Sequence, residues 1–349
     1  TSRCIEIAII SIVSKYLHLL STLLYYCNQA HFSTFSLWHF YLDLFKRIMD
    51  IKTFLNFDQA YFYNWILGSF ICCMLVHHWI SPKLFGAYCE SYKKLKKNKQ
   101  MEWDSRIVST IHALVVSLMS LCALIFERQI WSNRISYASP TGSRALSITV
   151  GYFMCDIISM PMYWRGKSLI IFFIHHTFSA GAFLYAINIQ SCIFFCIIRL
   201  TSELSTPFTN QRWIYLTSGL THGHKRVVYS TLAFAILFSI VRNWIIAPYW
   251  IMVYLDYNSE AHRQSKSVNQ YLDYVWLGCA GVLDILNIYW GPGVYRSGRR
   301  AFQAVHPTFS LKSLKYLYNS DDDDENNSDS SDQTKLEKQN SNHSFSKID

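Results

Sequence analysis

Long apolar runs are the feature that most limits how this chain can fold, because about 20 apolar residues let an α-helix cross a membrane. Six runs are clear: Tyr61–Ile80, Ile107–Phe126, Ala145–Tyr163, Leu169–Ile187, Val227–Pro248 and Tyr271–Trp290. A seventh, Ile189–Leu204, would reach only about 24 Å as a helix, so we expect it to be tilted, partly re-entrant or in locally thinned membrane. The sequence therefore predicts an all-α fold, a polytopic membrane helical bundle with six or seven transmembrane helices.

Composition agrees with a membrane protein. Hydrophobic residues make up 51% of the 349 residues and charged residues only 16%, whereas a soluble globular chain carries about 25% charge. The ten cysteines form no CxxC pair and no Cys/His framework, so neither a disulfide scaffold nor a zinc site is expected. The histidines lack the HxxxH and HxxHH spacings of membrane-bound iron enzymes, so we expect no metal.

Basic residues are distributed unevenly between the two sets of loops. If all seven runs cross, one side collects seventeen Lys and Arg and the other only five. Such an excess marks the cytoplasmic side, which places the C-terminal tail in the cytoplasm. The positive charge is thus an orientation signal, and the basic loop at residues 93–99 gives no support to a nucleic-acid partner.

The sequence divides into three regions. Residues 1–60 form an N-terminal extension, in which Glu6, Lys15 and His18 interrupt an apolar segment at 5–26, and whether that segment spans the membrane stays open. Residues 61–295 hold the transmembrane domain. Residues 296–349 form a tail that is acidic and expected to be disordered from about residue 319. Because the chain opens with Thr1 rather than Met, we expect that its natural N-terminus lies further upstream.

Polar side chains inside the predicted spans are candidates for a functional site, because burying them in a membrane is costly. Counted from the cytoplasmic ends of the runs, those on five helices fall roughly 6–11 Å deep, in one shallow layer. The residues expected to line a polar or lipid-binding site are His112, Asp156, His175, His176, Arg199, Glu203, Asp284 and Asn287. Arg242, some fifteen residues into its run, is expected to lie apart from them.

Helix geometry predicts some local relations within this layer. Arg199 and Glu203 are four residues apart and can form an ion pair within one helix. His175 and His176 lie about 100° apart around their helix, so only one can face a given cavity squarely. The small residues at 179–182 are expected to let another backbone approach closely. The layer either fixes helix packing or lines a cavity open to the cytoplasm, in which a histidine oriented by a carboxylate acts as base or nucleophile.

Five motifs in order are similar to those of the TLC-domain family, over roughly residues 60–295. They are Trp103-Asp-Ser-Arg-Ile-Val-Ser-Thr-Ile-His112, Gly151-Tyr-Phe-Met-Cys-Asp156, His175-His176, Glu203-Leu-Ser-Thr-Pro-Phe-Thr-Asn-Gln-Arg-Trp213 and Val282-Leu-Asp284-Ile-Leu-Asn287. The resemblance implies a helical bundle in the endoplasmic reticulum or another internal membrane, with the histidine doublet in its cavity. The family includes the ceramide synthases, which are acyl-CoA-dependent N-acyltransferases, and members linked to lipid sensing, trafficking or membrane composition.

The resemblance to ceramide synthases is incomplete. The doublet at 175–176 aligns with theirs, but where they carry His-Asp followed by another Asp, this chain reads Arg199-Leu-Thr-Ser-Glu203. Two functions therefore stay open. The first is a protein that binds or handles membrane lipid and influences membrane lipid composition. The second is an acyltransferase that takes acyl-CoA as substrate and uses His175 or His176, assisted by Asp156 or Glu203. Neither needs a cofactor, and the oligomeric state is not predicted.

Overall fold

The computed structural model describes residues 60–259 and 270–305, with side chains for 61–259 and 277–305. The apolar segment at 5–26 and the acidic tail lie outside these ranges. Within them the chain is helical and contains no β-strand. The all-α fold predicted from the apolar runs is therefore confirmed.

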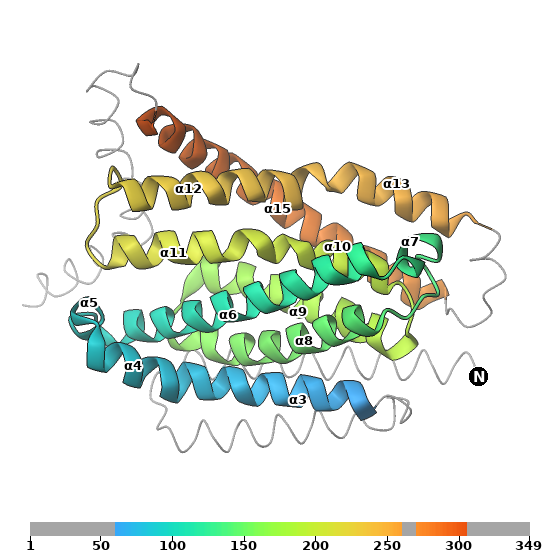
Figure 1. The fold of residues 1–349 in the computed structure, drawn as a ribbon, viewed down its shortest axis with the longest axis horizontal. Coiled ribbons are helices and arrows are strands. Elements are labelled where there is room, and N and C mark those ends of the chain that lie inside the picture. Colours follow the sequence, from blue (N-terminus) through green and yellow to red (C-terminus); the bar gives the residue numbers. More distant parts are fainter. Residues whose placement is uncertain (1–59, 260–269, 306–349) are drawn as a thin grey trace, which may run out of the picture. The chain divides into compact units, whose positions relative to one another are not determined.

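Seven helical passes run back and forth through the bundle (Figure 1). They are α3–η3–α4 (Ala60–Leu75, Val76–Ile80, Ser81–Tyr88), α6 (Lys97–Phe126), α8 with η4 (Pro140–Ser159, Met160–Met162), α9 (Gly166–Ile189), α10–η5–α11 (Ile193–Leu200, Thr201–Ser205, Thr206–Thr217), α12–η6–α13 (Lys225–Phe238, Ser239–Trp244, Ile246–Tyr257) and α15 (Gln270–Val305). Two short helices, α5 (Glu90–Lys93) and α7 (Gln129–Ser132), lie in the connections.

Five of these passes are long and apolar enough to cross a membrane. They are Tyr61–Tyr88, Lys97–Phe126, Pro140–Met162, Gly166–Ile189 and Lys225–Tyr257. The other two passes are not among these five. They are α10–η5–α11, which holds the seventh run from Ile193 onward, and α15, which holds the sixth. Their crossing stays a prediction, although both pack among the other passes of the bundle.

The seventh run begins and ends elsewhere than its apolar residues indicate. A tight turn in which Gln190 and Cys192 have positive φ angles of 49° and 59° separates it from α9. From Ile193 the helical path continues to Thr217, well past Leu204. At 1.5 Å per residue this path is about 38 Å long. The expected shortfall in length is therefore wrong, because polar residues extend the helix beyond the apolar run.

Basic residues gather at one end of the bundle, as the loop count predicts. The α5–α6 junction, the α8–α9 connection and the α11–α12 connection lie together at the left in Figure 1. They carry Lys93–Lys99, Arg165 with Lys167, and Lys225 with Arg226. We call this the basic end. Its assignment to the cytoplasm stays a prediction.

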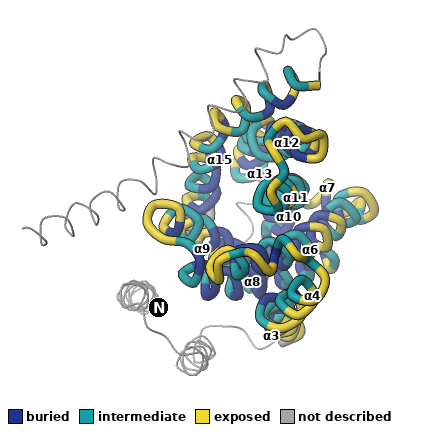
Figure 2. Tube along the Cα trace, turned by 90° about the vertical axis from the view of Figure 1, so that its left-hand side faces the viewer, coloured by how far each residue is buried: buried dark blue, intermediate teal, exposed yellow. Residues whose placement is uncertain are grey.

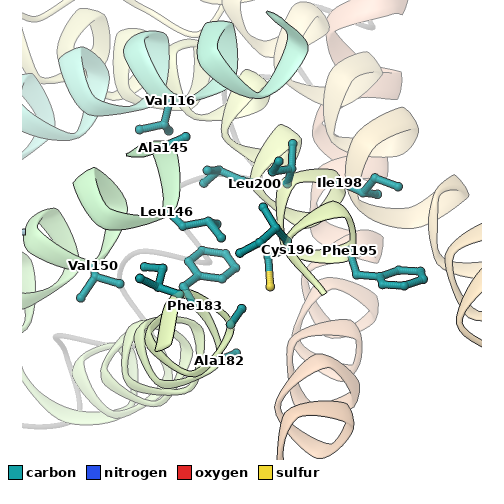
Figure 3. Packing of buried hydrophobic residues seen from close by; sticks show 14 of the residues in the cluster. Val116, Ala145, Leu146, Val150, Ala182, Phe183, Phe195, Cys196, Ile198 and Leu200 are labelled. Carbon is teal, nitrogen blue, oxygen red and sulfur yellow. The ribbon is translucent and has the colours of Figure 1, made fainter. Parts of the chain in front are cut away.

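The apolar core lies where α8, α9 and α10 meet. Leu146 and Val150 of α8 pack against Phe183 of α9 and against Cys196 and Leu200 of the α10 helix (Figure 3). Buried residues face inward along the helices, and exposed ones cover the outside (Figure 2). Large apolar side chains are among the exposed residues, as a surface in contact with lipid requires.

One glycine brings two helices into close contact. A Cβ atom on Gly151 of α8 would collide with the carbonyl oxygen of Ile66 and lie 2.9 Å from Phe70 N and Ser69 Cβ, all in α3. Ser69 Oγ also donates a hydrogen bond of 2.7 Å to the carbonyl oxygen of Ile148. Gly181 has open space instead, so the expected close approach does not occur at that residue. It occurs at Gly151, where α3 lies against α8.

Candidate functional site

Asp156 is the centre of a buried hydrogen-bonded group formed by α6, α8 and α9. Its Oδ1 accepts hydrogen bonds from Ser105 Oγ at 2.9 Å and Tyr163 OH at 3.1 Å. These two hydroxyl oxygens are themselves 2.9 Å apart. The second carboxylate oxygen, Oδ2, lies 3.2 Å from His176 Nδ1 in ion-pair contact, outside the alignment of a hydrogen bond. Three side chains from separate parts of the sequence are thus held around one carboxylate.

Local backbone structure places these groups. Ser139 caps the start of α8 by accepting a hydrogen bond of 2.9 Å from Gly142 N, and Pro140 occupies the first turn. The helix ends in the 3₁₀ turn at Met160–Met162, after which Tyr163 turns back toward Asp156, seven residues earlier. The turn therefore brings the Tyr163 phenol onto the carboxylate.

His112 lies beside this group but is held by other contacts. Its ring stacks on Tyr152 with centroids 3.9 Å apart and an interplanar angle of 15°. Its Nε2 lies 3.3 Å from Thr149 Oγ1, and its buried Nδ1 has no hydrogen-bond partner among the described residues. Phe153, also in α8, is stacked on His176 with ring centroids 4.7 Å apart. Aromatic rings of α8 thus pack against both His112 and His176.

The two histidines of the doublet face different neighbours, as their spacing predicts. His176 contacts Asp156, whereas His175 packs edge-on against Trp290 of α15 with ring centroids 5.5 Å apart. The buried Nδ1 of His175 has no hydrogen-bond partner in the described ranges. The two histidines therefore have different surroundings: His176 contacts a carboxylate, and His175 contacts an aromatic ring.

A second buried group joins α10, α13 and α15. Arg199 donates two hydrogen bonds to Asp284, with NH1–Oδ1 at 2.5 Å and NH2–Oδ2 at 2.6 Å. Trp250 Nε1 adds a hydrogen bond of 2.7 Å to Asp284 Oδ2, and the Arg199 guanidinium lies 3.7 Å from the ring centroid of Tyr249. The expected ion pair between Arg199 and Glu203 is wrong. The chain turns into the 3₁₀ helix η5 at Thr201, and residues four apart then no longer share a face.

A third group surrounds Arg242, in the π-helical turn η6. Its Nε donates a hydrogen bond of 3.0 Å to Ser205 Oγ, and NH1 and NH2 donate longer ones, 3.5 Å to Asn287 Oδ1 and 3.4 Å to Thr206 Oγ1. Glu203 Oε1 is 3.9 Å from NH2. The expectation that Arg242 lies apart is therefore wrong. Its helical path extends from Lys225 to Tyr257, beyond the apolar run, so distance along that run did not measure its level in the bundle.

The eight predicted site residues are thus divided among neighbouring groups rather than gathered in one. All except His175 are at most 9% exposed. Their charges nearly cancel, because the carboxylates of Asp284 and Glu203 face guanidiniums and that of Asp156 faces His176. A buried charge needs such a counter-charge. Over residues 60–259 and 270–305, no cluster of three or more His, Cys, Asp or Glu could hold a metal ion.

Several members of these groups were not found from the sequence. Ser105 had a signal, since it lies in the motif that starts at Trp103, but a serine alone does not indicate a carboxylate partner. Tyr163 and Trp250 carry their polar atoms on rings that count as apolar in a membrane span. Their roles depend on which helices become neighbours.

Other motif residues link helices near the basic end. Arg106 of α6 bonds Asn210 Oδ1 at 3.2 Å and lies 4.4 Å from the ring centroid of Trp213, both in α11. Nearby, the phenol of Tyr92 in α5 donates a hydrogen bond of 2.9 Å to Asp104 Oδ2, and burial raises the pKa of this phenol. The motifs that start at Trp103 and at Glu203 are therefore explained here by helix packing, because Arg106 of the first contacts Asn210 and Trp213 of the second.

The fold and the buried groups define a polytopic membrane protein with ionisable side chains inside its helical bundle. The family model of the TLC domain matches residues 102–292. TLC domain-containing protein 4-A of Xenopus laevis is 33% identical over 249 residues, which cover 71% of this chain and 94% of that protein. The chain therefore belongs to the TLC-domain family.

Other relatives are more distant. TLC domain-containing protein 4 of Homo sapiens is 26% identical over 222 residues, covering 64% of this chain and 83% of that protein. Protein CLN8 of Rattus norvegicus is 23% identical over 236 residues, covering 64% of this chain and 74% of that protein. No solved structure matches this chain. The resemblance inferred from the five motifs is confirmed.

Proposed function

We propose that this protein binds lipid between its helices and influences the lipid composition of the membrane around it. The observation that carries the proposal is the enclosure of charged side chains inside an apolar bundle: Asp156, Glu203, Asp284 and Arg199 are buried, and the Arg242 side chain is only 10% exposed. Each charge within a membrane helix costs about 2.5–3.5 kcal/mol, and well-packed apolar residues often replace buried ion pairs without loss of stability. Packing alone therefore does not call for this many charges.

Membrane lipids are the proposed partners, and the endoplasmic reticulum or another internal membrane is the proposed location. The collection of Lys and Arg at one end of the bundle supports a cytoplasmic position for that end. The C-terminal tail follows α15 and is proposed to lie on the same side.

Lipid profiling tests the proposal. Cells without the protein are compared with cells that express the wild-type chain, a variant with Asp156→Asn and His176→Gln, or a control with Ser132→Ala, which changes an exposed residue outside the buried groups. We expect wild type and control to restore a selective change in one lipid class, and the Asp156/His176 variant to fail although it accumulates normally. Identical lipid profiles in all four lines would contradict the proposal.

A second candidate, an acyltransferase, is favoured by the contact between Asp156 and His176. A carboxylate at the Nδ1 side of an imidazole holds the ring in place and stabilises its protonated form. Ser105 and Tyr163 fix that carboxylate from its other oxygen. Because Nδ1 of His176 faces Asp156, the other ring nitrogen, Nε2, is the one that we propose to meet the substrate. The same geometry is absent at His175, whose ring faces Trp290.

In the proposed reaction, His176 Nε2 takes the proton from an acceptor amine or hydroxyl. The acceptor attacks the thioester carbonyl of a long-chain acyl-CoA, the new acyl–nitrogen or acyl–oxygen bond forms, and the carbon–sulfur bond breaks. The departing thiolate receives the proton from His176. Asp156 stabilises the imidazolium that exists between the two proton transfers.

Labelled acyl-CoA with a panel of amine and lysolipid acceptors tests this second candidate. We expect product with the purified wild-type chain, loss of product in His176→Ala, and a decrease of about 10²–10⁴-fold in Asp156→Asn. His175→Ala is the matched control and should retain more activity than His176→Ala. Absence of product with every acceptor, or equal activity in wild type and His176→Ala, would contradict the acyltransferase.

A further inference from the structure

Arg199 and Arg242 differ in the kind of acceptor that their guanidiniums meet. Arg199 meets Asp284 through two parallel bonds of 2.5 and 2.6 Å, which is the strongest arrangement a guanidinium and a carboxylate can form. Arg242 has no such partner within residues 60–259 and 270–305. Its closest carboxylate oxygen, on Glu203, is 3.9 Å away, and its three hydrogen-bond acceptors are two hydroxyls and an amide. Only Arg199 is therefore paired in the manner of a structural ion pair.

The contacts of Arg242 are also long. Two of its three hydrogen bonds, to Thr206 and Asn287, measure 3.4 and 3.5 Å, against a usual range of about 2.7–3.2 Å. A guanidinium offers five N–H donors in a planar fork that matches a phosphate or carboxylate. At 10% side-chain exposure, Arg242 is buried too deeply for bulk water to satisfy the remainder. Each of its three nitrogens has an acceptor, but the three bonds use only three of the five N–H groups, which leaves donor capacity for an anion.

Neighbouring groups fit the same ligand. Arg242 lies in a π-helical turn, a deviation that is frequent at functional sites. Asn287, which it contacts, is three residues from Trp290 and so shares a face of α15 with it. Trp290 packs on His175, whose buried Nδ1 has no hydrogen-bond partner in the described chain.

We propose that Arg242, in contact with Asn287 and near the face of α15 on which His175 packs against Trp290, binds the oxyanion of a lipid, which is a phosphate or a carboxylate. This rests on the proposed lipid handling and specifies the ligand chemistry. The anion replaces the long contacts of Arg242 with shorter, charge-assisted ones. Glu203 opposes binding, because its negative charge already lies 3.9 Å from the guanidinium. The two residues therefore affect binding in opposite directions, unlike two halves of a structural ion pair.

Lipid binding to the purified full chain in neutral detergent tests the assignment. The probes are dioleoyl phosphatidate, oleate and dioleoylglycerol, each applied alone, with bound lipid measured by mass spectrometry after gel filtration. We expect Arg242→Gln to lose about 10- to 100-fold in affinity for the anionic probes and to retain dioleoylglycerol. Glu203→Gln should bind the anionic probes several-fold more tightly. Arg226→Gln, at the basic end, is the control for general loss of positive charge.

The outcomes separate the inference from the function beneath it. Retention of phosphatidate alone or of oleate alone identifies the oxyanion as phosphate or carboxylate. The anion site is overturned if Arg242→Gln and Glu203→Gln both leave the affinity for the anionic probes unchanged, or if both lower it. If the wild type also binds dioleoylglycerol in that case, the proposed lipid binding stands. If wild type retains none of the three probes, the proposed lipid binding fails as well. Glu203→Gln keeps the test decisive if Arg242→Gln does not fold. If Glu203 and Arg242 only form a structural ion pair, removal of the carboxylate does not increase the affinity of the protein for an anionic lipid.

Discussion

Replacement of Gly151 by alanine should push α3 away from α8. The added Cβ would collide with the Ile66 carbonyl oxygen and lie 2.9 Å from Phe70 N and Ser69 Cβ, whereas ordinary contacts begin at 3.4 Å. The backbones must therefore separate by about 0.5 Å or more. Two of the three obstacles are backbone atoms, which cannot rotate away as a side chain can. Overpacking of this kind costs about 1–3 kcal/mol.

Gly181→Ala is the matched control, because its Cβ would meet nothing within 4 Å. Alanine is favoured over glycine in a helix by about 1 kcal/mol at both sites, so the difference between the two variants isolates the collision. We expect Gly151→Ala to be less stable than Gly181→Ala by about 1–3 kcal/mol. Thermal unfolding of the detergent-purified full chain measures this difference. Equal midpoints for the two variants would refute the close packing of α3 on α8.

Three further perturbations follow from other contacts. Two hydrogen bonds of 2.6 Å join Arg134, in the α7–α8 connection, to Asp256 of α13. A double-mutant cycle of unfolding free energies with Arg134→Gln and Asp256→Asn should show a coupling of about 1 kcal/mol. Additive effects of the two substitutions would contradict a stabilising pair. Tyr92→Phe should lower stability by about 1–2 kcal/mol in thermal unfolding, because it leaves the buried α6 carboxylate short of a donor; an unchanged midpoint would mean that water replaces the phenol. Asp156→Cys and Glu203→Cys, each made in a chain without its native reactive cysteines, test whether a cavity opens to the cytoplasm. The two new cysteines should react with small thiol reagents applied from that side. Protection of both would indicate a closed, packed bundle.

Much of the fold could be predicted from the apolar runs, since each of the seven coincides over most of its length with one helical pass. The ends of the helices could not be predicted in this way, because an apolar run marks the part of a helix inside the membrane and not the residues at which the helix begins and ends. The α6 helix starts at Lys97, ten residues before its run, and α15 continues to Val305, beyond the expected domain end at 295. Polar residues extend these helices past the hydrocarbon region at no cost in desolvation.

The site shows the same division. Single residues such as Asp156 and Arg199 were found because a charge inside an apolar run is visible in the sequence alone. Their partners were not, since Arg199 bonds Asp284, 85 residues away, in preference to Glu203 four residues away. That choice depends on a 3₁₀ turn and on which helices pack together. Depth along separate runs was also a poor guide, as the contacts of Arg242 show.

The Arg199–Asp284 pair has a consequence for how the chain is made. The two residues are 85 positions apart, so at about 5–20 residues per second the ribosome adds Asp284 about 4–17 s after Arg199. During that interval the α10 guanidinium has no Asp284 to meet, and an unmatched charge in a membrane helix costs about 2.5–3.5 kcal/mol. We therefore expect the helix that contains Arg199 to reach its final packing only after α15 has been synthesised. A nascent chain stopped before residue 284 would expose this arginine to the quality-control machinery of the membrane.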